Sequence, residues 1–113
     1  MSKIARLETD LLRAITRILA REVKDPAVGF TTVTAVKLTS DHSYLTIYYT
    51  TLEEGKRETT AKALERSKPF IRTTLGKHVT MRKLPALVFK YDESLDRGNR
   101  IERGLKDVMK KDE

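Results

Sequence analysis

One quarter of the chain carries a dense cluster of positive charge. The segment 66–91 has seven basic residues and no Asp or Glu, whereas the rest of the chain has sixteen of each sign. The whole net charge of +7 therefore originates here. Such clustering favours a polyanionic partner, nucleic acid first and an anionic membrane second, over a merely solvated face. The seven residues are Arg66, Lys68, Arg72, Lys77, Arg82, Lys83 and Lys90.

Other chemistry has little support in the sequence. The chain has no cysteine, and its two histidines lie in different predicted elements. Asp41-His42-Ser43 has the residue types of a hydrolase triad, but three consecutive turn residues point in different directions. Asp92, Glu93 and Asp96 are better explained as the first turn of a helix than as a cation site. We therefore expect no enzyme, no metal and no cofactor.

An amphipathic helix is predicted over residues 3–24. Its apolar stripe is Ile4, Leu7, Leu11, Ile15, Ile18 and Leu19. A second row, on another face, contains Arg13, Arg17 and Arg21. These three arginines either contact phosphate or form a solvated face paired with nearby acids, and the sequence leaves both interpretations open.

Three strands are predicted, over residues 30–38, 43–51 and 84–92, with the first two joined in a hairpin through the turn 39–42. Tyr44 and Tyr48 share the polar side of the second strand. Without Lys or Arg beside them on that strand, we interpret them as surface cover rather than as base-stacking residues. The final residues, with Ile101, Leu105 and Val108 at helical spacing, predict a C-terminal helix.

Pro69 interrupts a helical pattern between the second and third strands. We predict a short helix over 59–66 and a second helix capped by Ser67, with Pro69 in its first turn and a kink at Ser67, Lys68 and Pro69. The first turn of that second helix would offer free N–H groups to a phosphate. Gly76 marks either the end of this helix or, less favoured, a close approach of RNA backbone.

Together these elements predict a single α+β domain over residues 1–113, a three-stranded sheet with its helices packed on one face. With 39% hydrophobic residues, no cysteine and no apolar run of signal-peptide or membrane-spanning length, we expect a cytoplasmic protein.

The chain resembles the ribosome-binding factor A family, bacterial assembly factors of the small ribosomal subunit. The resemblance rests on "REVKDPAVGFTTVTAVKLTSDHSYLTIYYT" and "ALERSKPFIRTTLGKHVTMRKLPALVFKYDES". It implies a type II KH-like fold, binding to the free 30S subunit, late 16S rRNA maturation including the 5′ end, and importance in the cold. The family has an Ala-x-Gly kink, where this chain has Ser67-Lys68-Pro69.

The resemblance attaches RNA binding to Lys68, Arg72, Lys77, Arg82 and Lys83, and the charge cluster adds Arg66. The hypothesis is that the kinked helices present a concave surface without acids to rRNA. On this hypothesis Lys68→Glu with Arg72→Glu would weaken subunit binding and leave the fold intact. The expected partner is 16S rRNA within the 30S subunit, bound by a monomer.

The alternative is a protein–protein adaptor that docks on a ribosomal protein or an assembly GTPase, with auxiliary RNA contact. Salt distinguishes the two, because phosphate contacts weaken steeply with salt and an apolar interface does not. A membrane-surface protein would need an exposed apolar face, and the apolar stripes here are expected to lie in the core.

Overall fold

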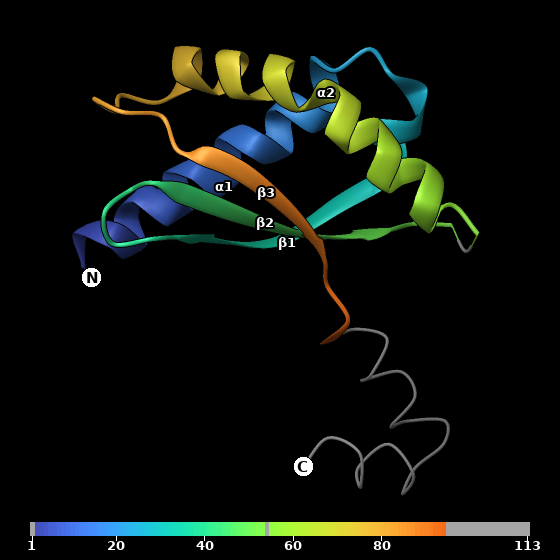
Figure 1. Ribbon diagram of the computed structural model, residues 1–113, viewed down its shortest axis with the longest axis horizontal. Helices are drawn as coiled ribbons and strands as arrows, with labels where there is room; N and C mark the ends of the chain where they lie inside the picture. Colours follow the sequence, from blue (N-terminus) through green and yellow to red (C-terminus); the bar gives the residue numbers. More distant parts are fainter. Residues whose placement is uncertain (1, 54, 95–113) are drawn as a thin grey trace, which may run out of the picture.

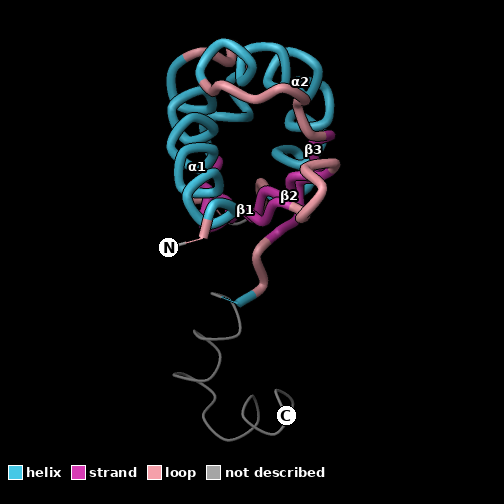
Figure 2. Tube along the Cα trace, turned by 90° about the vertical axis from the view of Figure 1, so that its left-hand side faces the viewer, coloured by secondary structure: helices cyan, strands magenta, loops and turns pink. Residues whose placement is uncertain are grey.

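Two helices lie across one face of a three-stranded sheet in the computed structural model, which describes residues 2–53 and 55–94 (Figure 1). The order along the chain is α1 (Lys3–Arg21), the 3₁₀ helix η1 (Pro26–Phe30), β1 (Thr31–Leu38), β2 (Tyr44–Thr51), α2 (Arg57–His78) and β3 (Ala86–Tyr91). Figure 2 shows both helices on the same side of the strands. This arrangement confirms the predicted α+β class, whereas the predicted C-terminal helix lies outside the described residues.

Helix α1 begins and ends through local signals. The Ser2 hydroxyl oxygen accepts a hydrogen bond from the Ala5 N–H at 3.0 Å and so caps the first turn. The helix ends at Arg21, three residues before the predicted end, and the chain becomes extended at Asp25 because Pro26 follows. Asp25 then caps η1 by accepting from the Ala27 N–H at 3.1 Å.

The sheet has β2 at its centre, antiparallel to β1 and parallel to β3. The predicted hairpin is confirmed. In its turn, the Asp41 carboxylate accepts hydrogen bonds from the Ser43 N–H and the Thr39 hydroxyl, and His42 adopts a positive φ of 64°. A bulge at Thr34 shifts the register between β1 and β2.

Helix α2 corrects the prediction of two separately capped helices. It is one helix that begins at Arg57 and contains Pro69, and Ser67 is a helical residue rather than a cap. Pro69 cannot donate a hydrogen bond to the preceding turn, and the axis of α2 changes direction partway along (Figure 1). The kink is therefore a bend within one helix. The N–H groups of residues 68–71, the predicted first turn of a second helix, lie inside α2, so the predicted phosphate site at a helix N-terminus is absent there.

The core fills the space between the helix layer and the sheet. The burial pattern of β2 confirms the predicted alternation, since Leu45, Ile47 and Tyr49 are buried and Tyr44 is 53% exposed. The side chains with no exposed surface include Leu11, Ile15 and Ile18 from α1, Leu45 and Ile47 from β2, and Leu64, Ile71 and Leu75 from α2. Both helices are therefore held against the sheet by apolar contact, which fixes the spacing between them.

Candidate nucleic-acid interface

The basic residues around the bend of α2 are bonded within the protein. The Arg66 guanidinium lies 2.8 Å from the Asp25 carboxylate, and the Lys68 ammonium lies 2.9 Å from the Glu65 carboxylate. The expectation of a surface without acids is therefore wrong at these two positions. It failed because a stretch without acids in sequence can still meet acids supplied by the residues before it and by another element.

Arg72 forms part of the fold. Its Nε donates to the Pro85 carbonyl at 2.9 Å, and its Nη2 donates to the Leu84 carbonyl at 2.8 Å. These two hydrogen bonds attach α2 to the segment that leads into β3. The planar guanidinium is suited to this task, because its donors are held in a rigid fork.

Arg66 and Arg72 therefore face different elements. Arg66 points toward Asp25, which caps η1, and Arg72 points toward the segment that precedes β3. The ion pair with Arg66 changes the acidity of Asp25, whose pKa is lowered from its usual 3.8. The largest cause is the hydrogen bond from Arg66, followed by the one from the Ala27 N–H.

Three more of the predicted residues, Lys77, Arg82 and Lys83, are exposed beyond the bend. The pKa of Asp41 is lowered, chiefly by the hydrogen bond from the Ser43 N–H and in small part by the charge of Lys83. Lys83 lies near the β1–β2 turn, since the N–H of Ala86, three residues later, donates to the Ser43 carbonyl at 2.8 Å. The predicted cluster is thus spread over several faces.

The favoured interpretation of Gly76 as a helix end is close to what is observed, since α2 ends two residues later at His78, and the glycine has a further role. It lies in the last turn of α2, and a Cβ built on it would stand 2.9 Å from a methyl carbon of Leu84. The glycine thus allows the chain before β3 to pass close to the helix, beside the hydrogen bonds of Arg72.

The arginines of α1 are placed differently. Arg13, Arg17 and Arg21 are all exposed, and no carboxylate in residues 2–53 and 55–94 forms an ion pair with them. They recur every four residues, so consecutive guanidinium groups start about 6 Å apart along the helix axis. Of the two interpretations left open by the sequence, pairing with acids is not observed in the described part of the chain.

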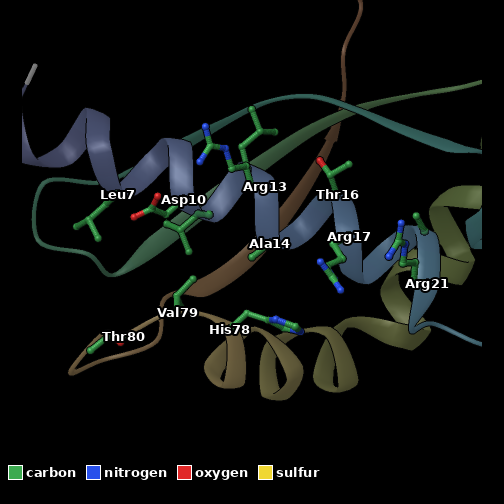
Figure 3. Close-up of a pocket in the computed structure, with 13 residues that line it drawn as sticks. Leu7, Asp10, Arg13, Ala14, Thr16, Arg17, Arg21, His78, Val79 and Thr80 are labelled. Atoms are coloured by element: carbon green, nitrogen blue, oxygen red, sulfur yellow. The ribbon is translucent and has the colours of Figure 1, made fainter.

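A groove of about 960 Å³ runs between this arginine row and the C-terminal end of α2 (Figure 3). In Figure 3 Arg17 extends from α1 toward the side on which His78 lies, whereas Arg13 points away from it. The partly exposed side chains of Leu7 and Leu12 contribute apolar surface to the lining, and Asp10 contributes one acid. The groove therefore combines an apolar floor with a basic rim.

The second wall of the groove comes from His78, Val79 and Thr80, which the sequence did not indicate. The His78 ring nitrogen Nε2 lies 2.8 Å from the Glu22 carboxylate and so links the ends of the two helices. Val79 packs against the core. The amphipathic spacing of α1 is a sequence signal for the wall that α1 forms. The sequence holds no comparable signal for the wall formed by residues 78–80.

The described residues contain no group of three potential metal ligands. Nor does that part of the chain include a helix long and apolar enough to cross a bilayer. The arrangement offers cations and hydrogen-bond donors, which suit the binding of a phosphate backbone.

Comparison with known proteins identifies relatives of the whole fold. The family model described as "Ribosome-binding factor A" matches residues 3–105. A protein of that name from Staphylococcus saprophyticus is 44% identical over 108 residues, which is 95% of each chain.

Solved structures of similar fold belong to proteins of the same name. The crystal structure of ribosome-binding factor A from Thermus thermophilus superimposes with a TM-score of 0.72 at 33% identity, covering 80% of this chain and 97% of that one. A homology model of the Thermus thermophilus protein, fitted into a cryo-EM map of its complex with 30S, has a TM-score of 0.67 at 33% identity and covers 80% and 96%.

Proposed function

Because the chain belongs to the ribosome-binding factor A family, we propose that it binds the free 30S ribosomal subunit in the cytoplasm and supports late maturation of 16S rRNA. The proposal includes processing of the 5′ end of 16S rRNA and a greater need for the protein during growth in the cold. The supporting relative is the Thermus thermophilus protein fitted into a map of its 30S complex, which shares the described fold.

The observation that carries the RNA-binding part is the arginine row of α1. Arg17 and Arg21 stand at the rim of a groove and have no ion-pair partner in the described residues, so phosphate binding breaks no ion pair of that part of the chain. We assign the main phosphate contacts to this row. Lys77, Arg82 and Lys83 extend the positive surface, whereas Arg66, Lys68 and Arg72 mainly shape the fold and add to the potential.

Sedimentation with purified 30S, 50S and 70S particles tests the proposal. We expect co-migration with 30S alone, weakening steeply between low and physiological salt. Equal binding to all three particles would mean non-specific electrostatics. Binding to 30S that is insensitive to salt would instead favour the adaptor alternative, and absence of binding at either salt would overturn the proposal.

The maturation role needs its own measurement. Primer extension on 16S rRNA from cells that lack the protein should show extended 5′ ends, more so in the cold, and the wild-type gene should restore the mature end. A normal 5′ end in these cells would restrict the protein to subunit binding.

A further inference from the structure

The face of the sheet turned away from the helices carries two tyrosines and two lysines. Because Leu45, Ile47 and Tyr49 point into the core, Tyr44, Thr46 and Tyr48 point to the opposite side. Tyr44 is 53% exposed and Tyr48 is partly exposed. Figures 1 and 2 show α1 and α2 on the other side of the strands. No described helix therefore covers these rings.

Strand pairing places lysines beside the tyrosines. In one row across the sheet Tyr48 lies between Ala35 of β1 and Lys90 of β3, and in the next row Thr46 pairs with Lys37. Directly paired residues on one face have Cβ atoms about 5 Å apart, so the side chains of Lys90 and Tyr48 start side by side. The sequence of β2 does not indicate these cations, because they come from the two neighbouring strands.

The charge of this face is positive. β1, β2 and β3 contain no Asp or Glu, and neither Lys37 nor Lys90 has an ion-pair partner in the part of the chain that the structure describes. The acid that directly follows β3 is Asp92, whose carboxylate accepts a hydrogen bond from Thr34 at 2.5 Å and others from Ser94. The strands of this face therefore carry only positive charge, and the acids that flank it, Asp41 before β2 and Asp92 after β3, lie just beyond its two ends.

We propose that this face is a second RNA-binding surface, which stacks bases of single-stranded RNA on Tyr44 and Tyr48 while Lys37 and Lys90 bind the adjoining phosphates. The two tyrosines are four residues apart on one strand, a separation of about 13 Å, which leaves room for one nucleotide between the stacked bases. Stacking on aromatic rings tolerates any base, so little sequence preference is expected. The inference goes beyond 30S binding, because it concerns unpaired nucleotides and a different face from the α1 groove.

The test is fluorescence anisotropy of the full chain with a fluorescein-labelled octamer of uridine, against a labelled RNA duplex. We expect tighter binding of the octamer, a loss of about tenfold in Tyr44→Ala, and little change in Tyr44→Phe, which keeps the ring. Lys37→Gln with Lys90→Gln should lower the slope of log affinity against log salt by about 1.4, since each single-strand phosphate contact contributes about 0.7.

Phe70→Ala is the matched control, because Phe70 is 50% exposed but lies on α2. An equal loss in Phe70→Ala and Tyr44→Ala would overturn the proposal, as would absence of octamer binding or no preference over the duplex. Since Tyr48 is partly buried, its role is read in the wild-type protein from upfield shifts of its ring protons on adding the octamer. Unshifted ring protons would exclude stacking.

A second copy of the chain is the other candidate occupant. A wild-type dimer in analytical ultracentrifugation that Tyr44→Ala converts to a monomer would overturn the proposal. Co-sedimentation with 30S separates the two proposals. Octamer binding that depends on Tyr44, in a protein that ignores 30S, would support this inference and refute the proposed function.

Discussion

The basic residues of α2 and those of α1 look alike in sequence and differ in their bonding. Around the bend of α2, Arg66, Lys68 and Arg72 each have a partner within the protein, a carboxylate for the first two and a pair of carbonyls for the third. On α1, Arg17 and Arg21 border a groove without such partners in the described residues. The charge density of a sequence gives the number of cations. Binding of a polyanion depends on how many of these cations have no partner within the protein.

The largest effect is expected from the α1 row. Arg17→Ala with Arg21→Ala should weaken 30S binding by more than about tenfold at physiological salt and lower the salt slope by about 2, because two phosphate contacts are lost. Both side chains are exposed, so the melting temperature should be nearly unchanged.

Lys3→Ala with Lys24→Ala is the matched control, since it removes the same charge from two other exposed positions that also lack an ion-pair partner in the described residues. The variants are compared by co-sedimentation with 30S over a salt series. Equal losses in both pairs would mean that total charge, rather than the α1 row, governs binding.

Arg72→Ala should act on stability. It removes two charge-assisted hydrogen bonds and leaves the carbonyls of Leu84 and Pro85 without these donors, so we expect a loss of about 1.5–3 kcal/mol in the free energy of unfolding. The hypothesis that charge reversal at Arg72 leaves the fold intact is revised accordingly. Urea denaturation measures the effect.

Arg72→Lys sharpens this prediction, because an ammonium keeps the charge but lacks the fork, and an intermediate loss is expected. Wild-type stability in Arg72→Ala, together with weakened 30S binding, would return Arg72 to the RNA-binding residues.

Arg66→Gln should raise the pKa of Asp25 toward 3.8, because the hydrogen bond from Arg66 is the largest cause of its depression. A carboxyl with a lowered folded-state pKa stabilises the fold above its unfolded value, and this contribution disappears as the pH falls through the folded value. The variant should therefore lose less stability between pH 7 and pH 3 than the wild type. Carbon-detected NMR titration of the Asp25 carboxyl gives the pKa, and an unchanged value would show that the Ala27 N–H alone holds it.

The smallest effect is expected at Gly76. Ala is favoured over Gly inside a helix by about 1 kcal/mol, but its Cβ would push the end of the Leu84 side chain, so the net change in stability should stay within about 1 kcal/mol. Thermal unfolding measures it, with Gly29→Ala as a control that meets no atom within 4 Å. A loss above about 2 kcal/mol would mean that Leu84 cannot move and that the contact fixes the approach to β3.

Short-range patterns allowed much of the fold to be predicted. The apolar stripe of α1, the alternation along β2 and the turn at Asp41 each depend on residues within a few positions of one another, and all three are observed. The prediction failed at Pro69, where a local stop signal was expected to separate two helices. Burial of Leu64 on one side and Ile71 on the other keeps α2 continuous, because packing against the core outweighs one missing hydrogen bond.

The sequence by itself determined helix α1, the three strands, the excess of positive charge and the family. Only the tertiary structure decided which cations are available, because each partner comes from elsewhere in the fold: Asp25 for Arg66, the carbonyls before β3 for Arg72, and none in the described residues for Arg17. It also placed Lys90 beside Tyr48 through a parallel pairing that no local pattern encodes. Hydrogen bonds and ion pairs act over a few ångströms. Residues that are distant in the sequence come within that range only when the core packs.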